Sequence, residues 1–371
     1  MENIFWCKNC LNASTRPRIT FDKKGWCNAC QWMEQKKKLD WKKRETELIK
    51  ILDKYRTGSS KFDCVVPVSG GKDGSYVAYI LKKKYGMNPL AINISPPLPL
   101  EIGEKNINNF SKSGFDLLRL YLNKDVMMFL NKAGFKYKGF PYFGWLIAIQ
   151  SAVIKTAANF DISVIFYGED GEIEYGGSTE TKNNSLISID YQKKIWFEGG
   201  YEKILNKLPK NLKKYSSFWK FPSSKELNGK KIYTTTWSYF ENWDSYRNYI
   251  VAKKYFGLTE NPDGNEGTFT NFAQNDQALY ALHTYLMYLK FGFGRATQDA
   301  GIEIRRGAMT RSQAVNLVNL YDNNYPEKYI NDYLVYYQMT KKEFNSIIDK
   351  WANKKLFKKI KGKWQPKFIV K

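Results

Sequence analysis

Short apolar runs and longer amphipathic stretches alternate along residues 61–167. The runs of strand length are 62–68, 89–94, 115–121 and 162–167, and the stretches with helical periodicity are 76–86, about 102–114 and about 145–159. Strands that alternate with helices in this way form a parallel sheet with helices on both faces. The hydrophobic pattern therefore predicts an α/β fold for this part of the chain.

The pattern changes on both sides of this segment. Residues 33–56 carry charges at nearly every turn around a broken apolar stripe, which predicts a solvated connecting helix that ends at Thr57-Gly58-Ser59-Ser60. Residues from about 185 to 260 are aromatic and lysine-rich without alternation, and we interpret them as an insertion or lid. From Asn275 onward the pattern is helical, with capping boxes at Thr310-Arg-Ser-Gln313 and Thr340-Lys-Lys-Glu343. The expected units are a cysteine-rich segment (1–35), the connecting helix (36–57), the α/β domain (58–185), the insertion or lid (186–265) and a helical C-terminal region (266–371).

The charge of the chain changes this picture less than its size suggests. The 371 residues include 59 Lys+Arg and 36 Asp+Glu, a formal net charge of +23, and 43% are hydrophobic, which excludes intrinsic disorder. Such a charge is typical of nucleic-acid binding. However, only ten of the 59 basic residues are arginine, and the lysines are spread along the whole chain. This distribution favours a lysine-rich compositional bias over a nucleic-acid footprint.

Several classes of protein are excluded by what the sequence lacks. The beginning, MENIFWCKNC, has no apolar signal segment, and the longest apolar run, Gly144–Ile154, contains Gln150 and falls short of the roughly 18 residues of a membrane span. We therefore expect a cytoplasmic protein without a membrane segment. His283 is the only histidine, so a zinc hydrolase with several histidine ligands is excluded. Its place among Leu282, Tyr285 and Leu286 in a helical pattern favours a packing or surface role over a catalytic one.

Four of the five cysteines form two pairs, Cys7-Lys-Asn-Cys10 and Cys27-Asn-Ala-Cys30, with 16 residues between the pairs. This spacing is typical of a structural Zn²⁺ site, whose four sulfur ligands leave no position open for catalysis. An iron–sulfur centre or redox pairs could use the same four thiols, whereas the expected cytoplasmic location opposes two disulfides. The fifth cysteine, Cys64, lies in the apolar run 62–68, where a buried, inert thiol is expected.

A glycine-rich loop directly follows the first predicted strand and directly precedes a helix. Its residues, all expected to bind phosphate, are Ser69, Gly70, Gly71, Lys72, Asp73, Gly74 and Ser75. Glycines let successive N–H groups point inward, and the helix adds its positive end, so the loop should form an anion cradle. It lacks the Gly-Lys-Ser/Thr ending of a Walker loop and the Gly-x-Gly-x-x-Gly of a Rossmann fingerprint.

The loop resembles the PP-loop, Ser-Gly-Gly-x-Asp-Ser/Thr, of ATP pyrophosphatases. Gly74 departs from that pattern, because it stands where the PP-loop has a hydroxyl residue. The resemblance implies an enzyme that cleaves ATP between the α and β phosphates and passes AMP to a substrate oxygen. A carboxylate such as Asp73 is a natural ligand for the Mg²⁺ that would accompany ATP.

Two further segments carry candidate chemistry. Glu169, Asp170 and Glu174 follow the strand predicted at 162–167, at the sheet edge where open α/β folds bind ligands. They are candidates for metal or substrate binding, and a merely solvated turn is the alternative. Four of the ten arginines fall within residues 295–311, which suggests an anionic ligand, although surface salt bridges with Asp299 and Glu303 would explain them as well.

Taken together, four motifs resemble one enzyme family: the paired CxxC knuckles, SGGKDG, GED-x-E-x-EYGG and KFGFGRAT…IRRG-x-MTR. This combination is similar to the N-acetyl sugar amidotransferases of bacterial surface-glycan synthesis, the WbpG/PseA-type proteins of lipopolysaccharide O-antigen and pseudaminic acid pathways. The similarity touches residues 7 to about 320. It implies that ATP adenylates the acetamido oxygen of an N-acetylated sugar, that ammonia displaces AMP, and that an acetamidino group results.

The resemblance also implies roles for single residues. ATP would bind at Ser69–Ser75, with Asp73, Glu169 and Asp170 as the catalytic group, and Glu174 would serve Mg²⁺ or the sugar. Arg295, Arg305 and Arg306 would face phosphate or a substrate carboxylate of a nucleotide-linked or acidic sugar. Relatives often carry a histidine or cysteine in the segment that reads Gly139-Phe-Pro-Tyr-Phe-Gly-Trp145 here, which leaves the sugar pocket open.

The source of nitrogen follows from the residues themselves. Release of ammonia from glutamine needs a nucleophilic cysteine with helper groups, and the chain offers only Cys64, His283 and an N-terminal Met. A separate glutaminase subunit or free ammonia must therefore supply it. The alternative function is a tRNA-thiolating PP-loop enzyme, which would suit a basic surface but generally needs further catalytic cysteines. Neither nucleic acid nor a membrane is the partner that these residues favour.

Overall fold

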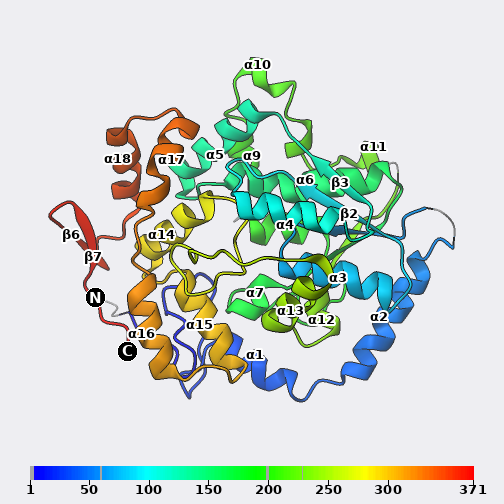
Figure 1. Ribbon diagram of the computed structural model, residues 1–371, viewed down its shortest axis with the longest axis horizontal. Coiled ribbons are helices and arrows are strands. Elements are labelled where there is room, and N and C mark those ends of the chain that lie inside the picture. Colours follow the sequence, from blue (N-terminus) through cyan, green and yellow to red (C-terminus); the bar gives the residue numbers. More distant parts are fainter. Residues whose placement is uncertain (1–3, 59–60, 198–199, 228) are drawn as a thin grey trace.

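The computed structural model describes residues 4–58, 61–197, 200–227 and 229–371 (Figure 1). At its centre is a five-stranded parallel sheet in the order β3-β2-β1-β4-β5. The strands are β1 (Cys64–Pro67), β2 (Pro89–Ile94), β3 (Leu117–Leu120), β4 (Val164–Tyr167) and β5 (Tyr233–Thr236). The first four strands lie within the four predicted apolar runs, so the predicted parallel α/β fold is confirmed.

Helices cover both faces of the sheet, as predicted. Val65 of β1 belongs to one hydrophobic core, and its neighbours Cys64 and Val66 belong to the other, because successive side chains of a strand point to opposite faces. The face of Val65 is covered by α5 (Lys124–Lys138), α6 (Phe143–Asn159) and α14 (Leu279–Phe291). The opposite face is covered by α2 (Trp41–Tyr55), α3 (Lys72–Lys83), α4 (Glu101–Ser111), α12 (Trp237–Phe240) and α13 (Ser245–Phe256).

The segment interpreted as an insertion or lid is part of the core. β5 pairs with β4 over four residues, and Phe197 and Trp219 are fully buried beside α6, where the Trp219 indole N–H donates to the carbonyl oxygen of Gly144 at 2.9 Å. The interpretation is therefore wrong for these residues. The strand sequence YTTT has no apolar alternation, and its β-branched threonines are buried by their neighbours. The short helices here are α8 (Ile189–Trp196), α9 (Glu202–Leu205), α10 (Lys210–Lys213) and α11 (Ser224–Leu227).

The C-terminal region is mainly helical and ends in a hairpin. Its further elements are α15 (Arg295–Arg305), α16 (Arg311–Tyr321), α17 (Ile330–Tyr337), α18 (Lys341–Trp351), β6 (Phe357–Ile360) and β7 (Lys363–Pro366). Both predicted capping boxes are present, at the start of α16 and of α18. The antiparallel hairpin β6–β7 differs from the helix expected there; its buried Phe357 and Trp364 alternate with exposed residues, the period of a strand.

The N-terminal segment folds around its cysteines and leads into two helices. α1 (Asn28–Lys36) begins directly after Cys27, and α2 lies within the predicted connecting helix. The face of α2 that carries Leu48 and Leu52 is buried, so this helix is not simply solvated. Of the predicted stop after it, Ser59 and Ser60 lie outside the described residues.

The most apolar run of the sequence, Gly144–Ile154, forms most of α6 and is buried beside the sheet. Among the described residues there is no helix whose length and apolarity would allow it to cross a membrane.

Candidate active site and four-cysteine centre

The turn between β1 and α3 is shaped by glycines that larger residues cannot replace. Gly70 has a left-handed φ of +79°, and a Cβ there would lie 2.5 Å from the backbone nitrogen of Ile107 in α4. A Cβ on Gly74 would lie 2.6 Å from the carbonyl oxygen of Pro67. The loop is thus pressed against α4 and the end of β1, and the unpaired N–H groups at the start of α3 are available to an anion.

This close packing explains the departure at Gly74, where the PP-loop has a hydroxyl residue. Ser75, the next hydroxyl along the chain, does not take over that role. Its side chain is fully buried, and within the described ranges its Oγ has no hydrogen-bond partner. The position of Ser75 therefore gives no support to its predicted contact with phosphate, and Gly70 shapes the loop rather than lining the cavity beside it.

A cavity of about 290 Å³ lies beyond the carboxyl ends of β1 and β4. Open α/β sheets bind ligands at such a point, where the connections that follow two neighbouring strands run toward opposite edges of the sheet. Here β1 connects toward β2, and β4 connects toward β5. Its walls come from the glycine-rich loop, from the segment after β4 and from the C-terminal region. The predicted site residues that line it are Ser69, Gly71, Lys72, Asp73, Gly74, Glu169 and Arg295.

Asp73 is held in place by three side chains. Its Oδ1 accepts hydrogen bonds from the Asn248 amide at 2.8 Å and from the Trp243 indole N–H at 3.2 Å. Its other carboxylate oxygen pairs with Lys72. Asn248 belongs to α13, which packs along α3, so the carboxylate is fixed by a neighbouring helix as well as by its own.

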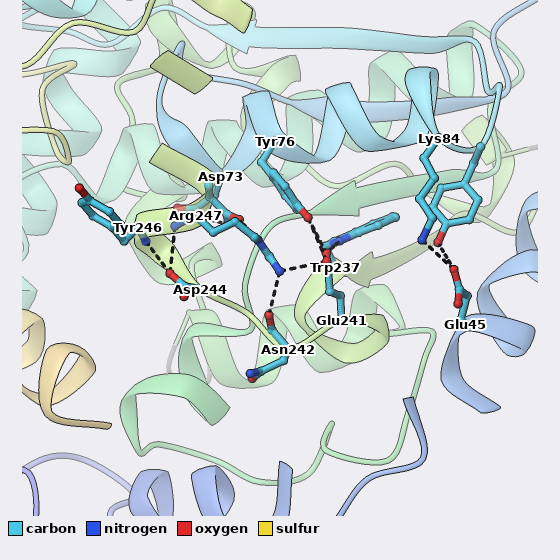
Figure 2. Close-up of polar contacts among 12 residues, drawn as sticks. Glu45, Asp73, Tyr76, Lys84, Trp237, Glu241, Asn242, Asp244, Tyr246 and Arg247 are labelled. Carbon is cyan, nitrogen blue, oxygen red and sulfur yellow. Dashed lines mark hydrogen bonds and ion pairs between the residues drawn. The ribbon is translucent and has the colours of Figure 1, made fainter. Parts of the chain in front are cut away.

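Glu241 fixes the junction between these two helices. It accepts hydrogen bonds from the Tyr76 hydroxyl at 2.8 Å and the Trp237 indole at 2.6 Å, and its other oxygen pairs with Arg247 at 2.9 Å (Figure 2). Figure 2 shows Asp73 beside the start of α13, close to Arg247. The network keeps α3 and α13 in register, and with them the donors to Asp73.

Of the three acidic residues predicted for the site after β4, Glu169 is the one that lines the cavity. It directly follows Gly168 at the end of β4, and the Tyr175 hydroxyl donates a long hydrogen bond of 3.4 Å to it. Burial, and after it the charge of Asp73, raise the pKa of Glu169 to about 7, while Lys72 opposes the shift. A carboxylate with such a pKa exchanges protons readily near neutral pH.

Asp170 and Glu174 do not line the cavity. Asp170 caps the short helix α7 (Gly171–Tyr175) and accepts from the N–H groups of Glu172 at 3.0 Å and Ile173 at 3.3 Å. Glu174 points the other way, toward α1, where it accepts from Trp32 and Lys36. The structure therefore gives both residues contacts that hold α7, and it does not bring them to the predicted site.

The three arginines are also separated. Arg295 lines the cavity and pairs with Asp299 at 2.8 Å. Arg305 lies near the four cysteines and donates to the carbonyl oxygen of Glu174 at 3.0 Å. Arg306 pairs with Glu303 at 2.7 Å. Arg305 and Arg306 line a second cavity of about 370 Å³ between α1, α13 and α15, so only Arg295 is placed to meet a ligand beside the loop.

The sequence analysis missed further residues that line the cavity. They are Asn106, Tyr175, the segment 272–276 and Tyr280. Asp276 stands out among them because it makes no ion pair with any residue in the described ranges, and the Tyr280 hydroxyl, at 3.4 Å, is its side-chain donor. Burial raises the pKa of Asp276 to about 6. Nothing in the polar stretch around it distinguishes Asp276 from an ordinary loop residue.

An aromatic cluster packs against Tyr280 of the cavity. Tyr280 packs edge-on against Tyr142 at 5.1 Å and against Trp145 at 6.2 Å, so the segment 139–145 backs the cavity through Tyr280. His283 lies against Phe140 and Tyr142, and burial lowers its pKa to about 3. His283 thus packs against aromatic side chains, which is one of the two roles, packing or surface, that its sequence position favours.

The four paired cysteines come together as predicted. Their sulfur atoms lie within 4.8 Å of one another, all four residues are buried, and no disulfide joins them. The side-chain amides of Asn9 and Asn12 donate to the sulfurs of Cys30 at 3.3 Å and Cys27 at 3.4 Å. Donors of this kind stabilise thiolate ligands, so the donor set fits a metal ion with four sulfur ligands.

Comparison with known families matches residues 266–369 to the family described as "LPS biosynthesis protein WbpG-like, C-terminal domain". This part of the chain is a WbpG-like C-terminal domain. The WbpG-like domain contributes the segment 272–276, Tyr280 and Arg295 to the cavity that the glycine-rich loop also lines. The resemblance based on sequence motifs is thereby confirmed at the level of the family.

Two individual proteins are also similar to the chain. An uncharacterized protein of Methanocaldococcus jannaschii is 28% identical over 120 residues, which are 32% of this chain and 43% of that protein. The chain thus spans less than half the length of this curated relative. Among solved structures, the U34-tRNA thiolase NcsA of Methanococcus maripaludis with its 4Fe–4S cluster aligns at 13% identity and a TM-score of 0.31, over 72% of this chain and 79% of that one.

Proposed function

We propose that the chain is an ATP-dependent amidotransferase that converts the acetamido group of an N-acetylated sugar into an acetamidino group. One observation carries the proposal: the PP-loop-like turn and the WbpG-like domain line the same cavity. The loop would bind ATP, and the domain named for lipopolysaccharide biosynthesis would place the sugar in the same cavity. We place the reaction in the cytoplasm, where ATP is available.

The chemistry has two balanced steps. The acetamido oxygen attacks the α-phosphorus of ATP, the bond to the β-phosphate oxygen breaks, and pyrophosphate leaves. The amide N–H proton is lost, so the adenylated group is a neutral imidate. Ammonia then adds to the imidate carbon, the C–O bond breaks, and AMP leaves with the former acetamido oxygen. Activation is needed because an amide oxygen is a poor leaving group, whereas AMP is a good one.

The residues of the cavity supply the groups that these steps require. The N–H groups at the start of α3, with Lys72, would hold the phosphates. The carboxylate of Asp73 suits a Mg²⁺–nucleotide, since Mg²⁺ usually takes one or two protein carboxylates besides phosphate oxygens. When bound, Mg²⁺ would offset the charge on the phosphates. We assign Asp73 to that ion and Glu169 to accept the amide proton.

Asp276 fits the product. An amidine is protonated at neutral pH, and its planar N–C–N group can pair with a carboxylate through two parallel hydrogen bonds, as arginine does. Within the described part of the chain, Asp276 has no cationic partner, whereas Asp73 pairs with Lys72. An acetamidinium beside Asp276 would supply the positive charge that this half-buried carboxylate lacks.

Ammonia must come from outside the chain. Cys64 is fully buried in β1, and burial raises the pKa of its thiol, so it does not suit a nucleophile that attacks glutamine. The four other cysteines are grouped as metal ligands, for which we propose a structural Zn²⁺. The partner would be a glutaminase subunit or free ammonia.

The test is mass spectrometry of acetamido sugars incubated with the protein, ATP, Mg²⁺ and ammonium. The proposal requires a mass decrease of about one unit, from replacement of O by NH, together with equimolar AMP. ATP consumption without a change in the sugar would refute it. Glutamine hydrolysis by the chain alone would refute the external source of ammonia.

The alternative, a tRNA-thiolating enzyme, is less well supported. Sulfur transfer would call for a cysteine at the cavity, and none of the five cysteines lines it. A salt-sensitive shift of tRNA mobility by the protein, with sulfur incorporated into the tRNA, would favour that function instead.

A further inference from the structure

The N-terminal segment, residues 4–36, is here called the cysteine module. It contacts α7 through hydrogen bonds and ion pairs that involve a few residues of that helix. Glu174 accepts from the Trp32 indole at 3.1 Å and from Lys36 at 2.9 Å, and all three side chains are largely buried. On the outside of the same contact, Arg18 pairs with Glu172 at 2.7 Å. The module therefore pairs with both acidic side chains of α7, Glu172 and Glu174.

The side chains of α1 that contact α7 form a stripe along one face of the helix. Asn28, Trp32 and Lys36 are four residues apart, so their side chains lie on one face of the helix. Asn28 donates to the carbonyl oxygen of Gly177 at 2.6 Å, directly after α7. Cys27 and Cys30 lie at the start of the same helix. A metal bound to these sulfurs would fix the rotation of α1 about its axis, and with it the direction of the stripe.

A single amide links the sulfur cluster to α7 directly. The Asn12 side-chain nitrogen donates to Cys27 Sγ at 3.4 Å and to the carbonyl oxygen of Tyr175 at 3.0 Å. The approach is so close that a Cβ on Gly176 would lie 2.9 Å from that nitrogen, and Gly176 has a left-handed φ of +93°. The glycine after Tyr175 in the EYGG motif thus permits this contact.

These contacts matter because α7 has little stability of its own. It has five residues, and a helix of one turn does not persist without packing. Glu169 lies just before it and Tyr175 at its end, and both line the cavity. Their positions therefore depend on what holds α7, and the cysteine module supplies much of this support alongside Arg305 of α15.

We propose that Asn12, Trp32 and Lys36 are positioning residues for the ATP cavity, which pass the geometry of the four-cysteine centre to Glu169 and Tyr175. The inference rests on the proposed function only in taking the cavity as the place where ATP reacts. Among the described residues, the side-chain hydrogen bonds between the glycine-rich loop and other elements go to α13 and the segment just before it, and not to the module. A loosened α7 should therefore disturb the reaction step more than nucleotide binding.

The experiment compares the double variant Trp32→Phe/Lys36→Met with Lys37→Met. Lys37 is the residue that caps the end of α1, and it pairs with exposed Glu34 at 2.6 Å and not with a residue of α7. In the double variant we expect unchanged metal content and amide exchange at residues 169–177 that is faster on the order of tenfold, while β1 and α3 stay protected. The kcat for AMP formation should fall by about tenfold or more at unchanged KM for ATP. When Lys36→Arg replaces Lys36→Met in the double variant, most of the amide-exchange protection and most of the kcat should be restored.

Three outcomes would overturn the proposal. One is exchange at 169–177 equal to that of Lys37→Met, and another is a rise in KM with kcat unchanged. The third is loss of metal from the double variant, because the contacts with α7 would then serve the metal centre and not the cavity. The exchange measurement needs no substrate, so the inference is tested even if the sugar reaction proves to be wrong.

Discussion

Glu169 has an ionisable carboxyl group, and burial and the charge of Asp73 disfavour its ionised form. If it accepts the amide proton, it must be ionised, so kcat/KM for AMP formation by the free enzyme should rise with pH through about 7. Glu169→Gln should lower the rate on the order of 100-fold and abolish this rising limb. Initial rates across the pH range test both. A limb that persists in Glu169→Gln would show that another group titrates.

The same shift has a consequence for stability. The pKa of Glu169 is raised in the folded protein, so between its usual value of 4.5 and about 7 the folded state retains a proton that the unfolded chain has lost. Stability therefore falls as pH rises through this window. Glu169→Gln should raise the melting temperature above the window and have little effect below it. Thermal unfolding of both proteins at the two pH values measures the difference.

Asp276 can be tested with a pair of small molecules. Acetamidinium and acetamide have the same shape, but only the former is charged. If Asp276 receives the amidinium, the wild-type protein should bind acetamidinium about tenfold more tightly than acetamide, and Asp276→Asn should remove the preference. Asp190→Asn is the control, since the Asp190 side chain is 94% exposed. Ligand-observed NMR reports both affinities. A preference that survives in Asp276→Asn would contradict the assignment.

At the scale of elements, the β1–loop–α3 unit makes an unusual prediction for Gly74→Ser. This substitution restores the hydroxyl residue of the PP-loop pattern, yet a Cβ here would lie 2.6 Å from the backbone oxygen of Pro67. We expect a loss of stability of about 1–3 kcal/mol and weaker binding of ATP, because the strand and helix must separate. Gly171→Ala, where the nearest atom is 3.5 Å away, is the control for a glycine in a first helical turn. Denaturant unfolding and calorimetry with ATP decide; tighter binding in Gly74→Ser would contradict the steric account.

The elements differ in how far the sequence could predict them. β1, β2 and β4 are apolar runs between turns, and their pattern agrees with their burial, while the apolar run of β3 is half-buried at the sheet edge. β5 is a run of threonines buried by tertiary neighbours, and no local pattern announces it. The same difference appears in the candidate site. The glycine loop and the cysteine pairs have local spacing rules, whereas Asp276 joins the cavity from a segment about 200 residues after the loop, through folding alone.

At the scale of the whole molecule, the cysteine module lies against the WbpG-like domain as well as against α7. The Thr15 hydroxyl donates to the carbonyl oxygen of Phe291, Arg311 to that of Cys7 at 3.5 Å, and Arg16 lies over the Phe293 ring. The Trp6 ring also packs against the Phe368 ring near the other end of the chain, with 5.7 Å between the ring centroids. The cysteine module thus connects α7 to the WbpG-like domain, and both of these line the cavity.

Metal removal should therefore loosen more than the module. We expect the isolated protein to hold one Zn²⁺ per chain and no iron, by elemental analysis. Chelation should lower the melting temperature by on the order of 10 °C, and amide exchange should rise in α7 and α15 together with the module. Cys64→Ser is the matched control, because this buried cysteine lies outside the cluster. Visible absorbance of an iron–sulfur centre would contradict the zinc assignment. Unchanged exchange in α7 after chelation would show that α7 holds its place without the metal.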